Sequence, residues 1–81
     1  DNIINKKLMN KIETVMVDSS AIFSAEYNTE KKEMIVYFNN DGIYKYHSVP
    51  SFYWRGLFES TSKGKFLNEF VFKKFTYNKL N

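Results

Sequence analysis

The sequence predicts an α+β domain in which a three-stranded antiparallel meander is followed by two short helices. Two apolar stretches flank a turn of Asn, Asp and Gly at residues 39–42, as in a β-hairpin. After Pro50 the apolar residues recur at helical rather than strand spacing. The chain has 81 residues, which is enough for one hydrophobic core and too few for two. We therefore expect a single domain whose strands precede its helices.

Residues 1–14 are expected to form an N-terminal arm or a short helix ahead of the domain, which then spans residues 15–81. Ile4, Leu8 and Ile12 recur every four residues, as on one face of an amphipathic helix. The Asn content and the absence of a clear helix cap suit an arm lying over the domain equally well.

The three predicted strands cover residues 21–27, 33–38 and 43–47. Their pairing decides where Tyr44 and Tyr46 point. If Phe38 faces Ile43 across the second turn, the two tyrosines lie on the face opposite to that of Phe38. Both faces then carry apolar side chains, so either both are covered or one is an exposed aromatic platform. A slip of one residue would move both tyrosines to the other face.

Two helices are predicted after the meander. Pro50 suits the first turn of a helix that continues through residues 52–60, and Thr61 or Ser62 can cap a second helix. The expected buried stripe of this second helix consists of Phe66, Leu67, Phe70, Val71 and Phe75. Phe72 falls outside the stripe, either as an exposed ring or as part of a short strand.

Several functional classes are excluded by composition. The absence of Cys excludes disulfide scaffolds, zinc fingers and thiol nucleophiles. Since His47 is the only His, no two-His metal site can form, and nothing around it resembles a catalytic triad. We therefore expect no enzyme, no cofactor and no metal.

A membrane location is not expected either. The longest apolar run covers residues 34–38, far short of the roughly 20 residues that a bilayer span needs. Because the first residues also lack the apolar segment of a signal peptide, we expect a cytoplasmic location.

Positive charge is concentrated in the last third of the chain. Residues 1–54 have a net charge of −1 and residues 55–81 a net charge of +4, which together give the overall +3. Aromatic residues make up 19% of the sequence, so cations for phosphates and rings for bases are both at hand. These features favour a non-catalytic module that binds RNA or another single-stranded nucleic acid, although a solvated lysine-rich surface would have the same composition.

The candidate residues divide into three groups. For nucleic-acid binding, the stacking rings are Tyr44 and Tyr46, and the phosphate contacts are Arg55, Lys63, Lys65, Lys73 and Lys74. Ser62 and Gly64 are expected to hold an anion at the start of the second helix. The alternative is a protein-interaction module, such as a phage-encoded inhibitor or accessory subunit, with Tyr53, Trp54 and Phe72 as its anchors.

An ordered series of short motifs resembles the KTSC domain, a small module named for its place at the C-terminus of some lysyl-tRNA synthetases and also found as a stand-alone bacterial protein. The motifs are Ser19-Ser20-x-Ile22, Tyr27, Val36-x-Phe38, Gly42-x-Tyr44-Lys45-Tyr46, Val49-Pro50 and Ser62-Lys63-Gly64-Lys65-Phe66. The similarity extends from about Val15 to Tyr77. It implies a non-catalytic domain, for which the association with a tRNA synthetase suggests RNA as a ligand.

Overall fold

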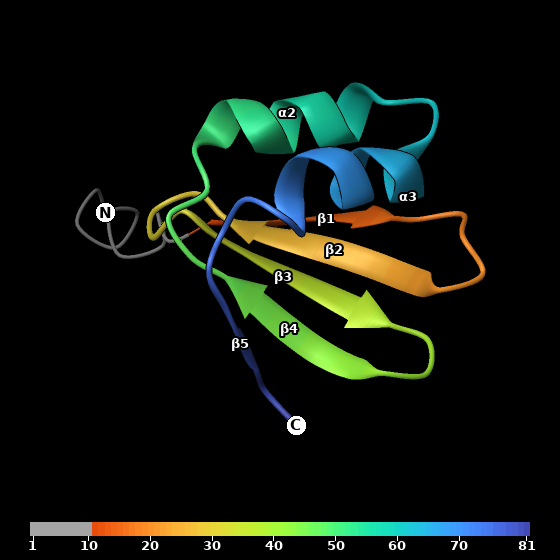
Figure 1. Cartoon of the computed structure of the whole chain (residues 1–81). Coiled ribbons are helices and arrows are strands. Elements are labelled where there is room, and N and C mark those ends of the chain that lie inside the picture. Colours follow the sequence, from red (N-terminus) through yellow and green to blue (C-terminus); the bar gives the residue numbers. More distant parts are fainter. Residues whose placement is uncertain (1–10) are drawn as a thin grey trace, which may run out of the picture.

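A five-stranded antiparallel sheet, with its strands in chain order, carries the helical segments on one face (Figure 1). The structure is a computed structural model that describes residues 11–81. Its elements are β1 (Ile12–Met16), β2 (Ile22–Asn28), β3 (Glu33–Phe38), β4 (Gly42–Tyr46), α2 (Ser51–Glu59), α3 (Lys63–Phe66), the π-helical η1 (Leu67–Val71) and β5 (Tyr77–Lys79). The α+β class, the three central strands and the two helical segments are thus confirmed.

The sheet has two strands more than predicted, and both are edge strands. In β1 only Val15 is half-buried, and every residue of β5 is exposed. Such strands lack the alternation of apolar and polar residues by which a half-buried strand is recognised in a sequence. Residues 12–14 therefore belong to the sheet rather than to an N-terminal arm or helix, and the rest of that prediction concerns residues outside the described part of the chain.

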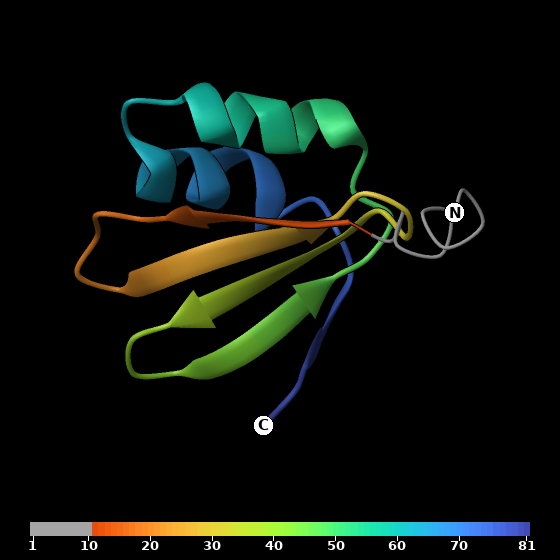
Figure 2. The ribbon, with the colours of Figure 1, turned by 180° about the vertical axis from the view of Figure 1, so that it is seen from behind.

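The hydrophobic core lies between the sheet and the helical layer, which both views place on the same side of the sheet (Figure 2). Its fully buried side chains come from both layers: Ala25, Tyr27, Met34, Val36, Val49, Leu57, Leu67 and Val71. The Tyr27 hydroxyl donates a hydrogen bond of 2.6 Å to the carbonyl oxygen of Val49. This bond ties the centre of the sheet to the segment that leads into α2.

The register of the β3–β4 hairpin differs by one residue from the predicted register. Phe38 pairs with Gly42 rather than with Ile43, so the loop contains residues 39–41. A three-residue hairpin loop is closed by a residue with positive φ, and Gly42 has φ +92°. Tyr44 and Tyr46 consequently lie on the face of Phe38, beneath the helical layer.

A wide turn in the second helix exchanges the roles of two phenylalanines. The backbone N–H of Phe72 donates to the carbonyl oxygen of Leu67, five residues earlier, as in a π-helix. The extra residue in this turn rotates Phe70 outward, to 47% exposure, and turns Phe72 toward Phe38 and Tyr46. The predicted stripe was therefore wrong at Phe70, because it assumed α-helical spacing throughout.

The Gly42→Ala substitution is expected to lower the free energy of unfolding by about 1–2 kcal/mol, because a side chain is strained at positive φ. An added Cβ would also lie 2.5 Å from Oδ1 of Asn81. Urea unfolding followed by circular dichroism measures this change. Gly64→Ala is the control, since its Cβ would approach only Ser19, at 3.3 Å, and should cost less. Equal stability of the Gly42→Ala variant and the wild type would contradict the role given to this turn.

Candidate functional site

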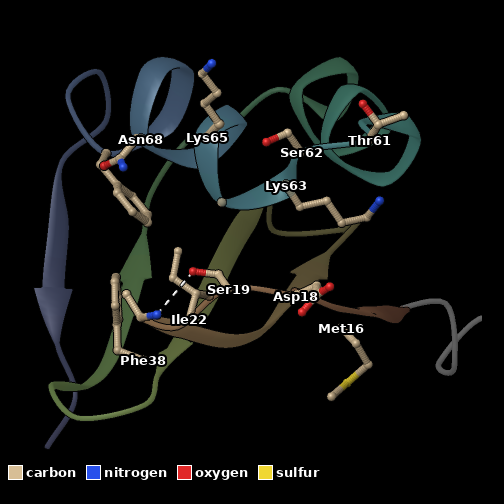
Figure 3. A pocket seen from close by; sticks show the side chains of 13 residues that line it. Met16, Asp18, Ser19, Ile22, Phe38, Thr61, Ser62, Lys63, Lys65 and Asn68 are labelled. Carbon is tan, nitrogen blue, oxygen red and sulfur yellow. Dashed lines mark hydrogen bonds between the residues drawn. The ribbon is translucent and has the colours of Figure 1, made fainter.

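The predicted anion-binding segment lines a pocket with a volume of about 690 Å³. Three parts of the chain meet here: the β1–β2 loop, the ends of β1, β2 and β3, and the start of α3 (Figure 3). The lining residues are Met16, Asp18, Ser19, Ala21, Ile22, Phe38, Thr61, Ser62, Lys63, Gly64, Lys65, Asn68 and Phe72. The pocket thus has a partly apolar floor and a polar rim.

The polar rim is chemically mixed. Asp18 places a carboxylate among the lysines, which weakens the attraction for an anion. The Nζ of Lys63 donates to the carbonyl oxygen of Ser60 at 2.6 Å, and Lys65 extends away from the pocket floor (Figure 3). The Ser62 side chain makes no capping hydrogen bond. The structure therefore brings Ser62, Lys63 and Gly64 together at one pocket without forming a closed anion cradle.

The two predicted stacking tyrosines lie on the helix-facing side of β4, among the rings of Phe38, Phe72 and Tyr77. Tyr46 is only 4% exposed, and its ring stacks on Phe72 with 5.4 Å between ring centroids. Burial raises the pKa of Tyr46 to about 12. Tyr44 is half-buried, packs edge-on against Phe38, and donates its hydroxyl to Asp41. Neither ring offers a free face on which a base could stack.

The anchors predicted for a protein partner are also packed. Trp54 is 5% exposed and stacks on Tyr27, and its Nε1–H donates to Oε1 of Glu13 at 2.9 Å. Tyr53 packs edge-on against Phe75, and Phe72 is held between Phe38 and Tyr46. Trp54 and Phe72 therefore connect the helical layer with the sheet, and Tyr53 connects α2 with the segment that follows η1.

The five predicted cations all lie on the helical layer or on the turn that follows η1. Within residues 11–81 none of them lies within 4.0 Å of a carboxylate, since the ion pairs there use Lys45, His47 and Lys79. Arg55, Lys65, Lys73 and Lys74 are exposed, and Lys63 is half-buried. Their positive charge is therefore available to an external anion.

Exposed rings accompany these cations, but they are not the predicted rings. Phe52 and Phe58 lie on the outer side of α2, on either side of Arg55. Phe70 projects from η1 and packs against Phe66, with 4.9 Å between ring centroids. The i, i+3, i+6 spacing of residues 52, 55 and 58 could have indicated a shared outer face in α2. No sequence signal marks Phe70, because its exposure depends on the π-helical turn.

Catalytic and metal-binding groups do not converge in the described part of the chain. No group of three or more His, Cys, Asp or Glu residues there could hold a metal ion. The Nε2 atom of His47 lies 2.6 Å from Oδ1 of Asn78, and its Nδ1 lies 3.8 Å from Glu33. These contacts connect β3, β4 and β5. Among residues 11–81, no helix has the length and apolarity needed to cross a membrane.

Comparison with known proteins identifies the family. The KTSC domain model matches residues 18–75, which is most of the chain. This chain belongs to the KTSC domain family. It is also similar to the crystal structure of a KTSC domain protein from Yersinia pestis, with 27% sequence identity and a TM-score of 0.79 over 88% of this chain and 100% of the other. No curated protein matches the sequence. The resemblance noted in the sequence is thus confirmed.

The motif residues of this KTSC domain have mainly structural contacts. The carbonyl oxygen of Val49 accepts the hydrogen bond from Tyr27, and Tyr46 is part of the core. Gly64 lets α3 approach the β1–β2 loop, because a Cβ at this position would lie 3.3 Å from that of Ser19. These motif residues therefore have a structural role in the fold. A binding surface is therefore better sought among the exposed side chains, which include Lys65 of the last motif.

Proposed function

We propose that this KTSC domain is a non-catalytic module that binds RNA or another single-stranded nucleic acid along α3 and η1. The observation that carries the proposal is the exposure of Phe70 beside lysines that have no carboxylate partner within residues 11–81. Lys73 and Lys74 follow Phe70 by three and four residues, and Lys65 precedes it on the same helical segment. Ring and charges therefore lie within reach of consecutive nucleotides.

The Phe66–Phe70 pair favours stacking of a base on Phe70 over a nonspecific apolar contact. Phe66 is half-buried and packs against Gly56 of α2, where an added Cβ would lie 2.8 Å from the ring. Its ring thus provides a fixed support for the Phe70 ring, which remains 47% exposed. An exposed aromatic face accepts any base, and bases of single strands are free to splay onto it. Lysines around such a ring bind the phosphates.

The remaining predicted cations extend this surface. Arg55 projects from the neighbouring helix α2, and Lys63 lies at the rim of the pocket. The backbone N–H of Ser62 already donates to the Ser60 hydroxyl at 3.0 Å, so the anion site predicted at Ser62 and Gly64 has no part in this proposal. Tyr44 and Tyr46 have no direct part in this proposal, since both rings are packed against other aromatic residues.

Removal of the proposed contacts is expected to weaken nucleic-acid binding in two distinguishable ways. Phe70→Ala should weaken binding of a single-stranded RNA by about 1–3 kcal/mol, which is about 5- to 150-fold, because a stacking platform is lost. The double variant Lys73→Ala/Lys74→Ala should weaken binding of all sequences and reduce the slope of log affinity against log salt by about 1.4. Fluorescence anisotropy with labelled RNA, tRNA and duplex DNA at several salt concentrations measures both effects.

Matched controls come from the sheet and from the β2–β3 turn. Phe23 is 56% exposed but belongs to β2, and Lys31 is an exposed lysine of the turn between β2 and β3. Phe23→Ala and Lys31→Ala should bind RNA as the wild type does. Absence of binding at low salt, or equal losses in the control variants and in Phe70→Ala, would refute the proposed surface.

A protein-interaction module is the second candidate, and one observation favours it. Ile12 and Met16 of β1 are 50% and 59% exposed, and they lie on the sheet face away from the basic helices. Exposed apolar residues grouped on one part of a small domain are typical of contacts between proteins. These residues, rather than Tyr53, Trp54 or Phe72, are the anchors available to a partner.

A further inference from the structure

We propose that β1 pairs with β1 of a second copy, so that two domains form one continuous ten-stranded sheet. This inference rests on the protein-interaction candidate, to which it assigns a specific partner, and it is independent of nucleic-acid binding. Three features of β1 support this pairing: the outward direction of its N–H and C=O groups, the sequence of its side chains and the groove beside it.

The outer edge of β1 has hydrogen-bonding groups that no strand within residues 11–81 uses. In the described part of the chain β1 pairs only with β2. The carbonyl of Lys11 and the N–H of Val17 bond to β2, so the odd-numbered residues of this strand face β2. The N–H and C=O groups of Ile12, Thr14 and Met16 therefore point outward.

The two edges of the sheet are protected to different degrees. β5 covers three residues and carries Lys79, which pairs with Asp41. Short length and edge lysines are common means by which proteins prevent strands from associating. β1 covers five residues and contains no Pro, Gly, Lys or Arg. It is thus the edge that is suited to further pairing.

The sequence of β1 is complementary to itself in the antiparallel direction. With Thr14 opposite Thr14 of the second copy, Ile12 faces Met16, and Glu13 faces Val15. Each pair formed by residues 12, 14 and 16 is of the type that exchanges both N–H···O bonds. Thr–Thr and apolar pairs stabilise neighbouring strands, whereas like charges directly opposite destabilise them. A register centred on Glu13 would oppose two carboxylates, which favours the register centred on Thr14.

A groove beside β1 offers space for the second strand's side chains. It has a volume of about 350 Å³ between α2 and β1, and Glu13, Trp54, Arg55 and Phe58 contribute to its lining. In the proposed register, Val15 of the second copy lies opposite Glu13 on the helix-facing side of the sheet. Phe58, which is 58% exposed, is available there for apolar contact. On the other face, Ile12 and Met16 of the two copies cover each other.

The symmetry of this pairing has a consequence for the basic surface. Antiparallel pairing of identical strands creates a twofold axis perpendicular to the sheet. Both helical layers then lie on the same side of the extended sheet, so that the dimer presents two basic surfaces in one direction.

Sedimentation of the full chain over a range of concentrations tests the proposal. The wild type should reach twice the chain mass of 9.7 kDa as its concentration rises. Thr14→Pro should remain monomeric, because it removes an outward N–H without removing a bond to β2. Should that variant fail to fold, Met16→Lys serves instead, since it places a charged side chain opposite Ile12 of the second copy at the edge. The control Leu80→Lys changes another apolar residue, 48% exposed and beyond β5, and should still dimerise.

Amide hydrogen exchange provides a second readout that does not involve nucleic acid. The Thr14 N–H should become at least 10-fold more protected with increasing concentration, whereas the Val15 N–H, which faces β2, should not change. A wild type that stays monomeric would overturn the proposal, even with a protected Thr14 amide. A dimer that persists in Thr14→Pro and Met16→Lys would overturn it as well.

Discussion

Replacing Trp54 with alanine is expected to lower the free energy of unfolding by about 3–5 kcal/mol, the usual cost of truncating a large buried ring. Trp54 is 5% exposed and lies between α2 and the sheet, where it stacks on Tyr27 with 5.5 Å between ring centroids. Its indole N–H also donates to Glu13, which links α2 to the edge strand β1. Because a small domain has a total stability of about 5–15 kcal/mol, this loss is a large share.

Two further variants separate the contributions of the Trp54 ring. Trp54→Phe keeps an aromatic ring on Tyr27 but removes the bond to Glu13, so the expected loss is smaller. Phe52→Ala removes a ring from the same helix that is 66% exposed, and it should cost less than about 1 kcal/mol. Urea unfolding followed by circular dichroism compares all three variants with the wild type. Equal losses in Trp54→Ala and Phe52→Ala would show that Trp54 does not join the two layers.

The parts of the fold that were predicted correctly depend on strong local signals. The polar turns and the apolar runs between them indicate the three central strands, and Pro50 precedes α2. The edge strands were missed because an edge strand buries little and has no clear pattern in the sequence. The predicted hairpin register was wrong by one residue, because Gly42 pairs with Phe38 as the first residue of β4 instead of remaining unpaired in the loop.

The candidate site was only partly predictable for a related reason. The cations were chosen by charge alone, and charged side chains remain at the surface in almost any packing. The rings were chosen by their position in the sequence, and their exposure depends on the register of one hairpin and on one π-helical turn. The register of the β3–β4 hairpin places Tyr44 and Tyr46 beneath the helices, and the π-helical turn directs Phe70 outward. Neither feature has a sequence signature that could be recognised before the fold is known.

The stability of the domain is expected to fall steeply between pH 10 and pH 12, chiefly because of Tyr46. Its pKa is raised to about 12 in the folded state by burial and, to a lesser degree, by the nearby Tyr77 and Tyr44. An unfolded tyrosine titrates near pH 10. Below pH 10 Tyr46 is neutral in both states, and its stabilising contribution is fully present. Between pH 10 and 12 only the unfolded state loses the proton, so folding loses about 2–3 kcal/mol from this residue.

The Tyr46→Phe variant isolates this contribution, because it keeps a ring against Phe72 and cannot ionise. Its unfolding free energy should match that of the wild type near pH 8 and exceed it by about 2 kcal/mol or more at pH 12. Urea unfolding at pH 8, 10, 11 and 12 followed by circular dichroism provides the comparison. Some alkaline loss should persist in the variant, since burial also raises the pKa of Tyr27. Identical pH profiles for variant and wild type would mean that the Tyr46 hydroxyl is free to ionise in the folded protein, contrary to its placement beneath η1.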